Sequence, residues 1–172
     1  MPVLYWPPIS QEGCAELEGL LGFALPSDYK AFLRQWNGLF VDLPDWVNLP
    51  FTKVDDGWIA FTFLFGFRVP NRNQDIEEHT SYLKDELAHI GDVAVIGEDG
   101  GTNYFVLMGS PDSGKVYYWD RTHLHHGAAV LEADIPEKNE CGNLYLVANT
   151  FGEFWRLVSG HLQGFDFKQR EA

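Results

Sequence analysis

Cysteine and basic residues are both scarce in this chain of 172 residues. It contains two cysteines, Cys14 and Cys141, and 12 Lys and Arg against 25 Asp and Glu, which gives a formal net charge of −13. Two cysteines do not form the disulfide framework of a small secreted protein. So acidic a chain repels the phosphate backbone of nucleic acids, and we expect no direct nucleic-acid binding. A basic protein partner, by contrast, would be attracted over long range.

Long apolar runs are also missing. The longest uncharged apolar run is Trp58–Phe67, and a membrane-spanning helix needs ~20 residues. The first residues contain no basic segment and are interrupted by Pro7 and Pro8, so the sequence predicts no signal peptide. We therefore expect a cytoplasmic protein with no membrane association.

Complete motifs for nucleotide binding are lacking as well. Gly109–Lys115 has the glycine and lysine spacing of a phosphate-binding loop, but Val116 stands where Ser or Thr would hold magnesium. The residues after Val116 are typical of a strand, whereas a phosphate loop needs a helix there. Lys115 is therefore interpreted as an exposed residue at the start of a strand.

Candidate metal ligands and catalytic acids occur without the spacing that defines a site. The candidate ligands are Asp120, His123, His125, His126 and Cys141. No His-Glu-x-x-His or Cys-x-x-Cys pattern is present among them, which favours polar loop histidines. Acidic pairs such as Glu98 and Asp99 would have to converge across a cleft to catalyse hydrolysis, and spacing cannot show that. The sequence thus predicts no enzyme, no cofactor and no metal site, with a small hydrolase as the third alternative.

What the chain does have is a large apolar and aromatic content, 45% and 15% of the residues, which excludes intrinsic disorder. Two helices are predicted near the N-terminus. Ser10 caps a helix over residues 11–21 that stops at Gly22, and Pro26 begins a second helix that ends at Asn37-Gly38. The apolar side of the first helix is formed by Cys14, Leu17, Leu20 and Leu21, and that of the second by Tyr29, Phe32, Leu33 and Trp36.

The remainder of the chain contains most of the predicted strands. Apolar residues alternate at period two in residues 59–67, and shorter strands are predicted at 93–97, 104–108 and 116–119. A helix is predicted over 75–87, and Thr150 with Glu153 forms a capping box that begins the last helix. Residues 39–58 are interpreted as a long loop or short edge strands.

These elements predict an α+β fold: one domain over residues 1–172, with a twisted, mainly antiparallel sheet and packing helices. Its core spans about residues 10–165, and residues 1–9 and 169–172 are peripheral. Phe32, Leu33 and Trp36 should pack on the strand that carries Phe61, Phe63 and Phe65, with Phe154 and Trp155 closing the same core. Gly38, Gly100 and Gly101 are expected at positive φ.

Three stretches, taken in order, resemble the SUKH superfamily. They are Glu18–Gly38, with its Leu-Gly, Leu-Pro, Asp-Tyr, Phe-Leu and Asn-Gly pairs; Ile90–Asp120, with Gly-Glu-Asp-Gly-Gly at 97–101; and Thr150–Trp155. Thr102 departs from the expected pattern, and residues 40–75 and 121–143 are longer than the family minimum. The resemblance implies an α+β fold without catalytic residues. It also implies a protein that works by binding, as bacterial immunity proteins against secreted toxins do, or as a fungal branch tied to cell-wall regulation does.

We therefore predict an immunity-type inhibitor of a cationic, nuclease-type toxin domain, with a regulatory or scaffold protein of the same family as the alternative. The predicted partner surface comprises Asp42, Asp45, Trp46, Asp55, Asp56 and Trp58 as first choice and Glu98 and Asp99 as second. Trp is enriched among residues that dominate binding energy. The other possibility is that both tryptophans lie in the core and the acids only solubilise a loop. Nothing in the residues indicates an oligomeric state.

Overall fold

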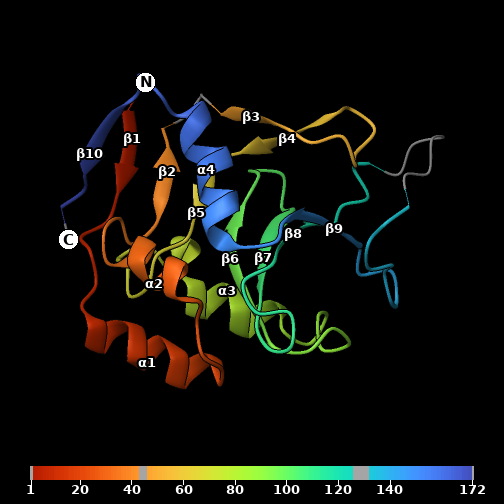
Figure 1. Ribbon diagram of the computed structural model, residues 1–172, viewed down its shortest axis with the longest axis horizontal. Coiled ribbons are helices and arrows are strands. Elements are labelled where there is room, and N and C mark those ends of the chain that lie inside the picture. The colour runs from red at the N-terminus through yellow and green to blue at the C-terminus, as the bar shows by residue number, and fades with distance from the viewer. Residues whose placement is uncertain (1, 43–45, 126–131, 172) are drawn as a thin grey trace.

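The computed structural model describes residues 2–42, 46–125 and 132–171 (Figure 1). Within them, eight strands form one sheet in the order β10-β1-β2-β5-β6-β7-β8-β9. All neighbours in this sheet are antiparallel except β1 and β10, which are parallel. The strands are β1 (Pro2–Tyr5), β2 (Leu39–Val41), β5 (Phe63–Leu64), β6 (Val93–Glu98), β7 (Tyr104–Met108), β8 (Val116–Asp120), β9 (Asn143–Ala148) and β10 (Asp166–Gln169).

A separate hairpin and the helices complete the described fold. The hairpin pairs β3 (Val47–Pro50) with β4 (Trp58–Phe61). The helices are α1 (Gln11–Leu21), α2 (Ser27–Leu33), α3 (Ile76–Leu83) and α4 (Phe151–His161), with a short 3-10 turn, η1 (Arg72–Gln74). This arrangement confirms the predicted α+β class and mainly antiparallel sheet. None of the helices in the described part of the chain has the length and apolarity needed to cross a membrane.

Local sequence signals determine where the helices begin and end. Ser10 Oγ accepts a hydrogen bond from the Gly13 amide, and α1 stops at Gly22, which has a φ of +82°. Thr150 Oγ1 accepts from the Glu153 amide, and Glu153 Oε2 accepts in return from the Asn149 amide, 3.0 Å away. These side chains satisfy amides that have no partner within the helix. Both predicted caps are confirmed.

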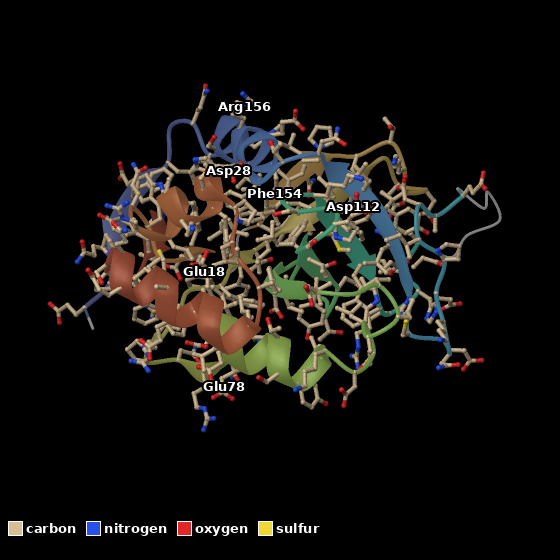
Figure 2. All side chains as sticks on the ribbon, turned by 60° about the horizontal axis from the view of Figure 1, so that its bottom comes forward. Glu18, Asp28, Glu78, Asp112, Phe154 and Arg156 are labelled. Atoms are coloured by element: carbon tan, nitrogen blue, oxygen red, sulfur yellow. The ribbon has the colours of Figure 1, made fainter. Side chains whose placement is uncertain are left out.

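The large sheet is covered on both faces. Phe105 on β7 faces α4, where its ring centroid lies 5.1 Å from that of Phe154, a fully buried residue (Figure 2). Its neighbour Tyr104 points to the opposite face and contacts His79 on α3. Because alternate side chains go to opposite sides of a strand, both sets are buried. This explains why every residue of β7 and β8 is buried.

The predicted strand over residues 59–67 is wrong in one respect, since it divides at Thr62 between two sheets. Residues up to Phe61 pair with β3, whereas the Thr62 carbonyl accepts from the Val41 amide and its own amide donates to Glu98 O, both in the large sheet. Phe63 is therefore only half-buried and stacks on Phe40, 4.7 Å away between centroids. Period-two alternation reports which side chains share a face, but not which strand is the partner.

The N-terminal residues also differ from expectation. Residues 1–9 are predicted to be peripheral, yet Val3 is fully buried in β1, between β2 and β10. Trp36 packs at this edge of the sheet, on Tyr5 and Phe167 at centroid distances of 5.1 and 5.0 Å and on Trp155 at 6.3 Å. Leu20, predicted on the apolar side of α1, is half exposed.

Two of the three predicted glycine conformations are confirmed. Gly38 has a φ of +92° and Gly100 a φ of +79°, whereas Thr102, and not Gly101, takes the next positive φ in that turn. At Gly38 a side chain is also excluded by close approach, because an added Cβ would lie 2.7 Å from the Gly66 amide nitrogen. Only glycine meets both conditions without strain.

Candidate functional site

The β3–β4 hairpin presents two tryptophans to solvent. Trp58 lies opposite Pro50, and their neighbours Leu49 and Ile59 are buried against the core. Trp46 directly precedes β3, and its side chain lies on the same solvent-facing side as that of Pro50. The exposed fractions are 58% for Trp46 and 40% for Trp58. We call this outward side, comprising Trp46, Asn48, Pro50, Trp58 and Ala60, the hairpin face; exposure of both rings favours the binding interpretation over the core interpretation.

The predicted acids lie around this hairpin at different positions. Asp55 and Asp56 are exposed in the turn between β3 and β4, close to Trp58 in the chain. Asp42 follows β2 and is half-buried. Asp45 lies outside the described residues. The turn therefore provides the most accessible negative charge beside the hairpin face.

Asp55 has a second role, because it contacts a histidine from a distant part of the chain. Its Oδ1 lies 2.6 Å from His125 Nδ1, and the His125 side chain is only 2% exposed. The hydrogen bond from His125 lowers the pKa of the Asp55 carboxyl below its usual value. Asp55 thus holds the turn through its contact with His125, whereas the exposed Asp56 carboxylate is accessible to a partner.

A pocket joins the two predicted segments at the other end of the hairpin. It has a volume of about 290 Å³ and is lined by Trp46, Ala60, Thr62, Phe63, Glu98, Asp99 and Gly100. The first-choice and second-choice surfaces of the sequence are therefore adjacent here. An indole beside carboxyl groups suits a basic side chain, which can contact both.

Asp99 contributes to this pocket mainly through structure. It is 8% exposed, and its carboxylate accepts from the Gly101 amide at 2.6 Å, from the amide and side chain of Asn103, and from the Tyr118 hydroxyl at 2.8 Å. Asn103 Oδ1 in turn accepts from the Thr122 amide. A carboxylate with so many donors shapes the turn and has little capacity left for a partner.

Glu98 is the carboxyl of this pocket whose charge state is most perturbed. Burial, with a smaller contribution from the Asp99 charge, raises its pKa from 4.5 to about 7. Because burial disfavours the ionised form, the folded protein binds this proton more tightly than the unfolded chain. The contribution of Glu98 to folding stability therefore falls as the pH rises from about 4.5 to about 7 and stays low above that range.

Glu98→Gln should consequently stabilise the protein at pH 8 and not at pH 4.5. The expected gain at pH 8 is about 1–2 kcal/mol, because the half-buried carboxyl is partly screened by solvent. Urea unfolding of both proteins at the two pH values measures this difference. If the free energy of unfolding varied with pH in the same way for the two proteins, the pKa of Glu98 would not be raised in the folded protein.

In the described part of the chain, the candidate metal ligands named from the sequence each have a different partner. His123 pairs with Glu137 at 2.7 Å, and Asp120 accepts from the amides of Leu124 and His125. His126 lies outside the described residues. Among the described residues, the set of His, Cys and acids close enough to share an ion is Asp55, Asp56 and His125. Sequence reasoning missed this set because the histidine is 70 residues from Asp55.

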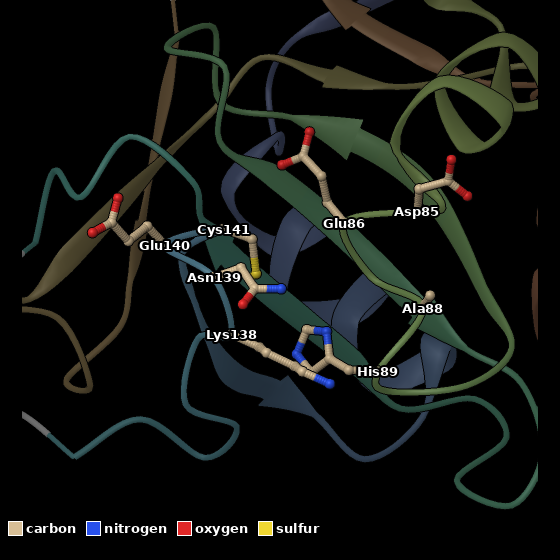
Figure 3. Close-up of a pocket in the computed structure, with 8 residues that line it drawn as sticks. All are labelled: Asp85, Glu86, Ala88, His89, Lys138, Asn139, Glu140 and Cys141. Carbon is tan, nitrogen blue, oxygen red and sulfur yellow. The ribbon is translucent and has the colours of Figure 1, made fainter.

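A larger cavity, of about 550 Å³, lies between the segment after α3 and residues 138–141 (Figure 3). Its walls include His89, Lys138 and Cys141, and Glu86 at its edge pairs with Arg121. The Cys141 thiol is directed to the Gly142 carbonyl, 3.8 Å away. The thiol that borders this cavity thus contacts the backbone of the residue that follows it.

Two similarities to known proteins accompany this geometry. Residues 8–156 match the SMI1 / KNR4 family (SUKH-1). The chain is also similar to a protein of Bacillus subtilis (strain 168), described as SPbeta prophage-derived uncharacterized protein YokK. The identity is 26% over 158 residues, which cover 84% of this chain and 72% of that protein.

Proposed function

The chain belongs to the SMI1 / KNR4 family (SUKH-1), and on this premise we propose that it is a non-catalytic immunity protein of the cytoplasm. It neutralises a basic, nuclease-type toxin domain by binding it through the hairpin face. The observation that carries the proposal is the exposure of Trp46 and Trp58 beside the acidic turn at Asp55 and Asp56. The prophage-derived description of the similar Bacillus subtilis protein agrees with a bacterial conflict system.

Charge supports a basic partner. The chain has a formal net charge of −13, and a nuclease domain must be cationic to hold its substrate. Complementary charge can raise association rates to ~10⁸–10⁹ M⁻¹s⁻¹ at low salt, against ~10⁵–10⁶ without steering. Such attraction is screened beyond ~8 Å at physiological salt, so a lasting complex also needs apolar anchors.

The hairpin face supplies those anchors. Trp46 borders the pocket that contains Glu98, and Trp58 stands near the acidic turn. A lysine or arginine of the partner that enters the pocket would contact the Trp46 ring and the Glu98 carboxyl together. Indole surface around such a contact excludes water and slows dissociation.

The proposal is tested by association kinetics with a basic, nuclease-type toxin domain, taken from the gene next to that of this chain where that gene encodes one. Asp56→Lys should slow association roughly two- to tenfold at low salt and flatten its salt dependence, because rim charges act mainly on the association rate. Asp56 is preferred to Asp55, whose replacement would also remove the partner of the buried His125. EDTA in the buffer keeps any metal effect out of the measurement.

Asp166→Lys is the matched control, since Asp166 is an exposed acid on the edge strand β10. It should change the association rate less than Asp56→Lys does. Equal effects of the two variants would mean that only total charge matters and that the acidic turn is not at the interface. A chain that binds no neighbouring toxin domain but captures another protein would favour the regulatory or scaffold alternative.

A further inference from the structure

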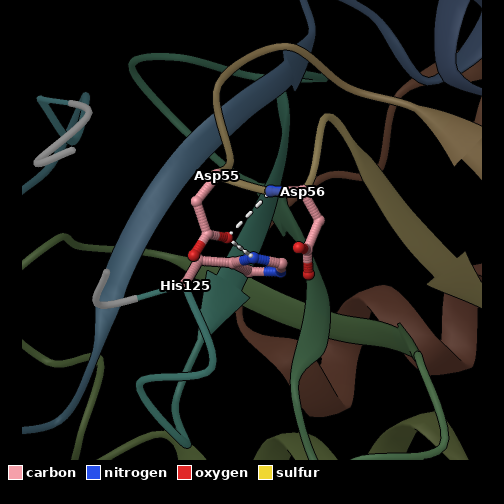
Figure 4. Close-up of side chains that lie close together, drawn as sticks. All are labelled: Asp55, Asp56 and His125. Carbon is pink, nitrogen blue, oxygen red and sulfur yellow. Dashed lines mark hydrogen bonds and ion pairs between the residues drawn. The ribbon is translucent and has the colours of Figure 1, made fainter. Parts of the chain in front are cut away.

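The acidic turn also contacts a buried histidine, His125, that the proposed binding function does not use. His125 follows β8, and its ring reaches the turn between β3 and β4, where it lies with Asp55 and Asp56 (Figure 4). One candidate ligand atom from each of the three residues lies within 4.8 Å of the other two. The cluster thus joins two segments that are far apart in the sequence.

The backbone and packing hold the His125 ring in place. The amides of Leu124 and His125 donate to the two oxygens of Asp120, at 2.8 and 3.0 Å. The ring packs edge-on against Tyr118, with 5.8 Å between centroids. With a side chain only 2% exposed, His125 has a fixed direction before anything binds.

The hydrogen bond to Asp55 fixes which ring nitrogen carries the proton. Asp55 Oδ1 accepts from the Asp56 amide at 3.0 Å and lies 2.6 Å from His125 Nδ1. An ionised carboxylate can only accept, so Nδ1 is the donor. In the neutral ring, Nε2 is then left with a free lone pair.

That lone pair has no protein donor. His125 Nε2 is buried and has no hydrogen-bond partner among the residues that the structure describes. Buried polar atoms are nearly always paired, and an exception needs an explanation, such as a bound water or an ion. The nearest acid not already engaged with the ring is Asp56, on the other side of it in Figure 4.

We propose that His125 Nε2 and the Asp56 carboxylate bind a divalent transition-metal cation, with zinc as the probe, and that Asp55 positions the ring. A carboxylate on the second nitrogen of a metal-binding histidine is a recurrent arrangement, because it sets the tautomer and raises ligand basicity. Ligands ~2.0–2.2 Å from one zinc ion lie ~3–4 Å apart. The exposed Asp56 side chain closes that gap by a change of rotamer, and its exposure leaves the remaining positions of the ion open to solvent.

The ligand chemistry indicates the kind of ion. An imidazole nitrogen with a carboxylate suits zinc and its neighbours in the first transition series, whereas magnesium and calcium prefer oxygen alone. The sequence alone predicted no metal site and assigned His125 to a polar loop. The inference does not depend on the proposed function, since it concerns the isolated chain.

Zinc titration of the full chain by calorimetry tests the site, after EDTA treatment and dialysis at pH 7.5. We expect one zinc site per chain and no binding of magnesium at the same concentration. Asp56→Asn should weaken zinc binding about tenfold or more, and Asp55→Asn about 10–100-fold, as is typical of positioning carboxylates. His125→Gln should remove the site.

Asp166→Asn, which replaces an exposed acid on β10, is the matched control and should bind zinc as the unmodified chain does. Asp56→Asn alters only an exposed side chain, so its result stands even if His125→Gln fails to fold. The inference is overturned if the unmodified chain binds no zinc, if Asp56→Asn leaves the affinity unchanged, or if magnesium binds equally well. Loss of zinc in His89→Gln and not in Asp56→Asn would also overturn it, by placing the ion at the other buried unpaired histidine nitrogen.

Discussion

Asp99→Ala should lower the free energy of unfolding by about 3–5 kcal/mol, because it leaves several buried hydrogen-bond donors without their acceptor. The Asp99 carboxylate accepts hydrogen bonds from Gly101, Asn103 and Tyr118, and the residue is 8% exposed. Alanine would leave a buried tyrosine hydroxyl and a buried amide without an acceptor. Each such unsatisfied group costs about 1–3 kcal/mol.

Urea unfolding followed by tryptophan fluorescence measures this loss. Asp99→Asn, which keeps the shape and part of the accepting capacity, should lose less than Asp99→Ala, and Asp166→Ala on the exposed edge should lose almost nothing. A loss below about 1 kcal/mol for Asp99→Ala would show that the carboxylate is not essential to the turn. Asp99 would then again be a candidate for contact with a partner.

The sequence predicts best where the signals are local. The caps at Ser10 and Thr150 and the left-handed end at Gly22 depend on residues a few positions apart, and the structure has them as expected. The second helix, by contrast, ends at Leu33 and not at Asn37-Gly38, although Gly38 has the expected positive φ. The strands in the middle of the large sheet were also predictable, because strands covered on both faces consist of nearly continuous apolar residues.

Elements that depend on distant partners escaped prediction. In β10 no residue is buried and Phe167 is the single apolar residue, so the strand is too short and too polar to be recognised from its sequence. The strand predicted over residues 59–67 divides at Thr62 because the backbone groups before and after this residue form hydrogen bonds with different sheets. Likewise, the contact of His125 with Asp55 exists only because the hairpin folds back over the end of β8.

Part of the candidate site was predictable and part was not. The combination of tryptophan and acid at residues 42–58 predicted a partner surface, but the sequence could not decide whether Trp46 and Trp58 are buried. Their exposure depends on the register of β3 with β4, which sends Leu49 and Ile59 inward. The role of Asp99 was hidden because a buried, fully bonded carboxylate and an exposed turn acid look alike in a Gly-rich sequence.

Replacing both exposed tryptophans should have the largest effect on partner binding. Central tryptophans in interfaces typically contribute about 2 kcal/mol each, so Trp46→Ala with Trp58→Ala should weaken the complex about 10³-fold. Folding should be little affected, since these rings are 58% and 40% exposed in the free chain. Tyr82→Ala is the matched control, because Tyr82 is a 78% exposed aromatic on α3, the helix that packs on the opposite side of the large sheet.

The dissociation constant of this double variant for the proposed partner, a basic nuclease-type toxin domain from a neighbouring gene, measured by calorimetry, tests the central claim most directly. The hairpin-face account predicts a loss of at least about 100-fold for Trp46→Ala/Trp58→Ala, unchanged binding for Tyr82→Ala, and the same unfolding midpoint for both variants. A double variant that binds the toxin domain as tightly as the unmodified chain would contradict the account and place the interface elsewhere on the molecule.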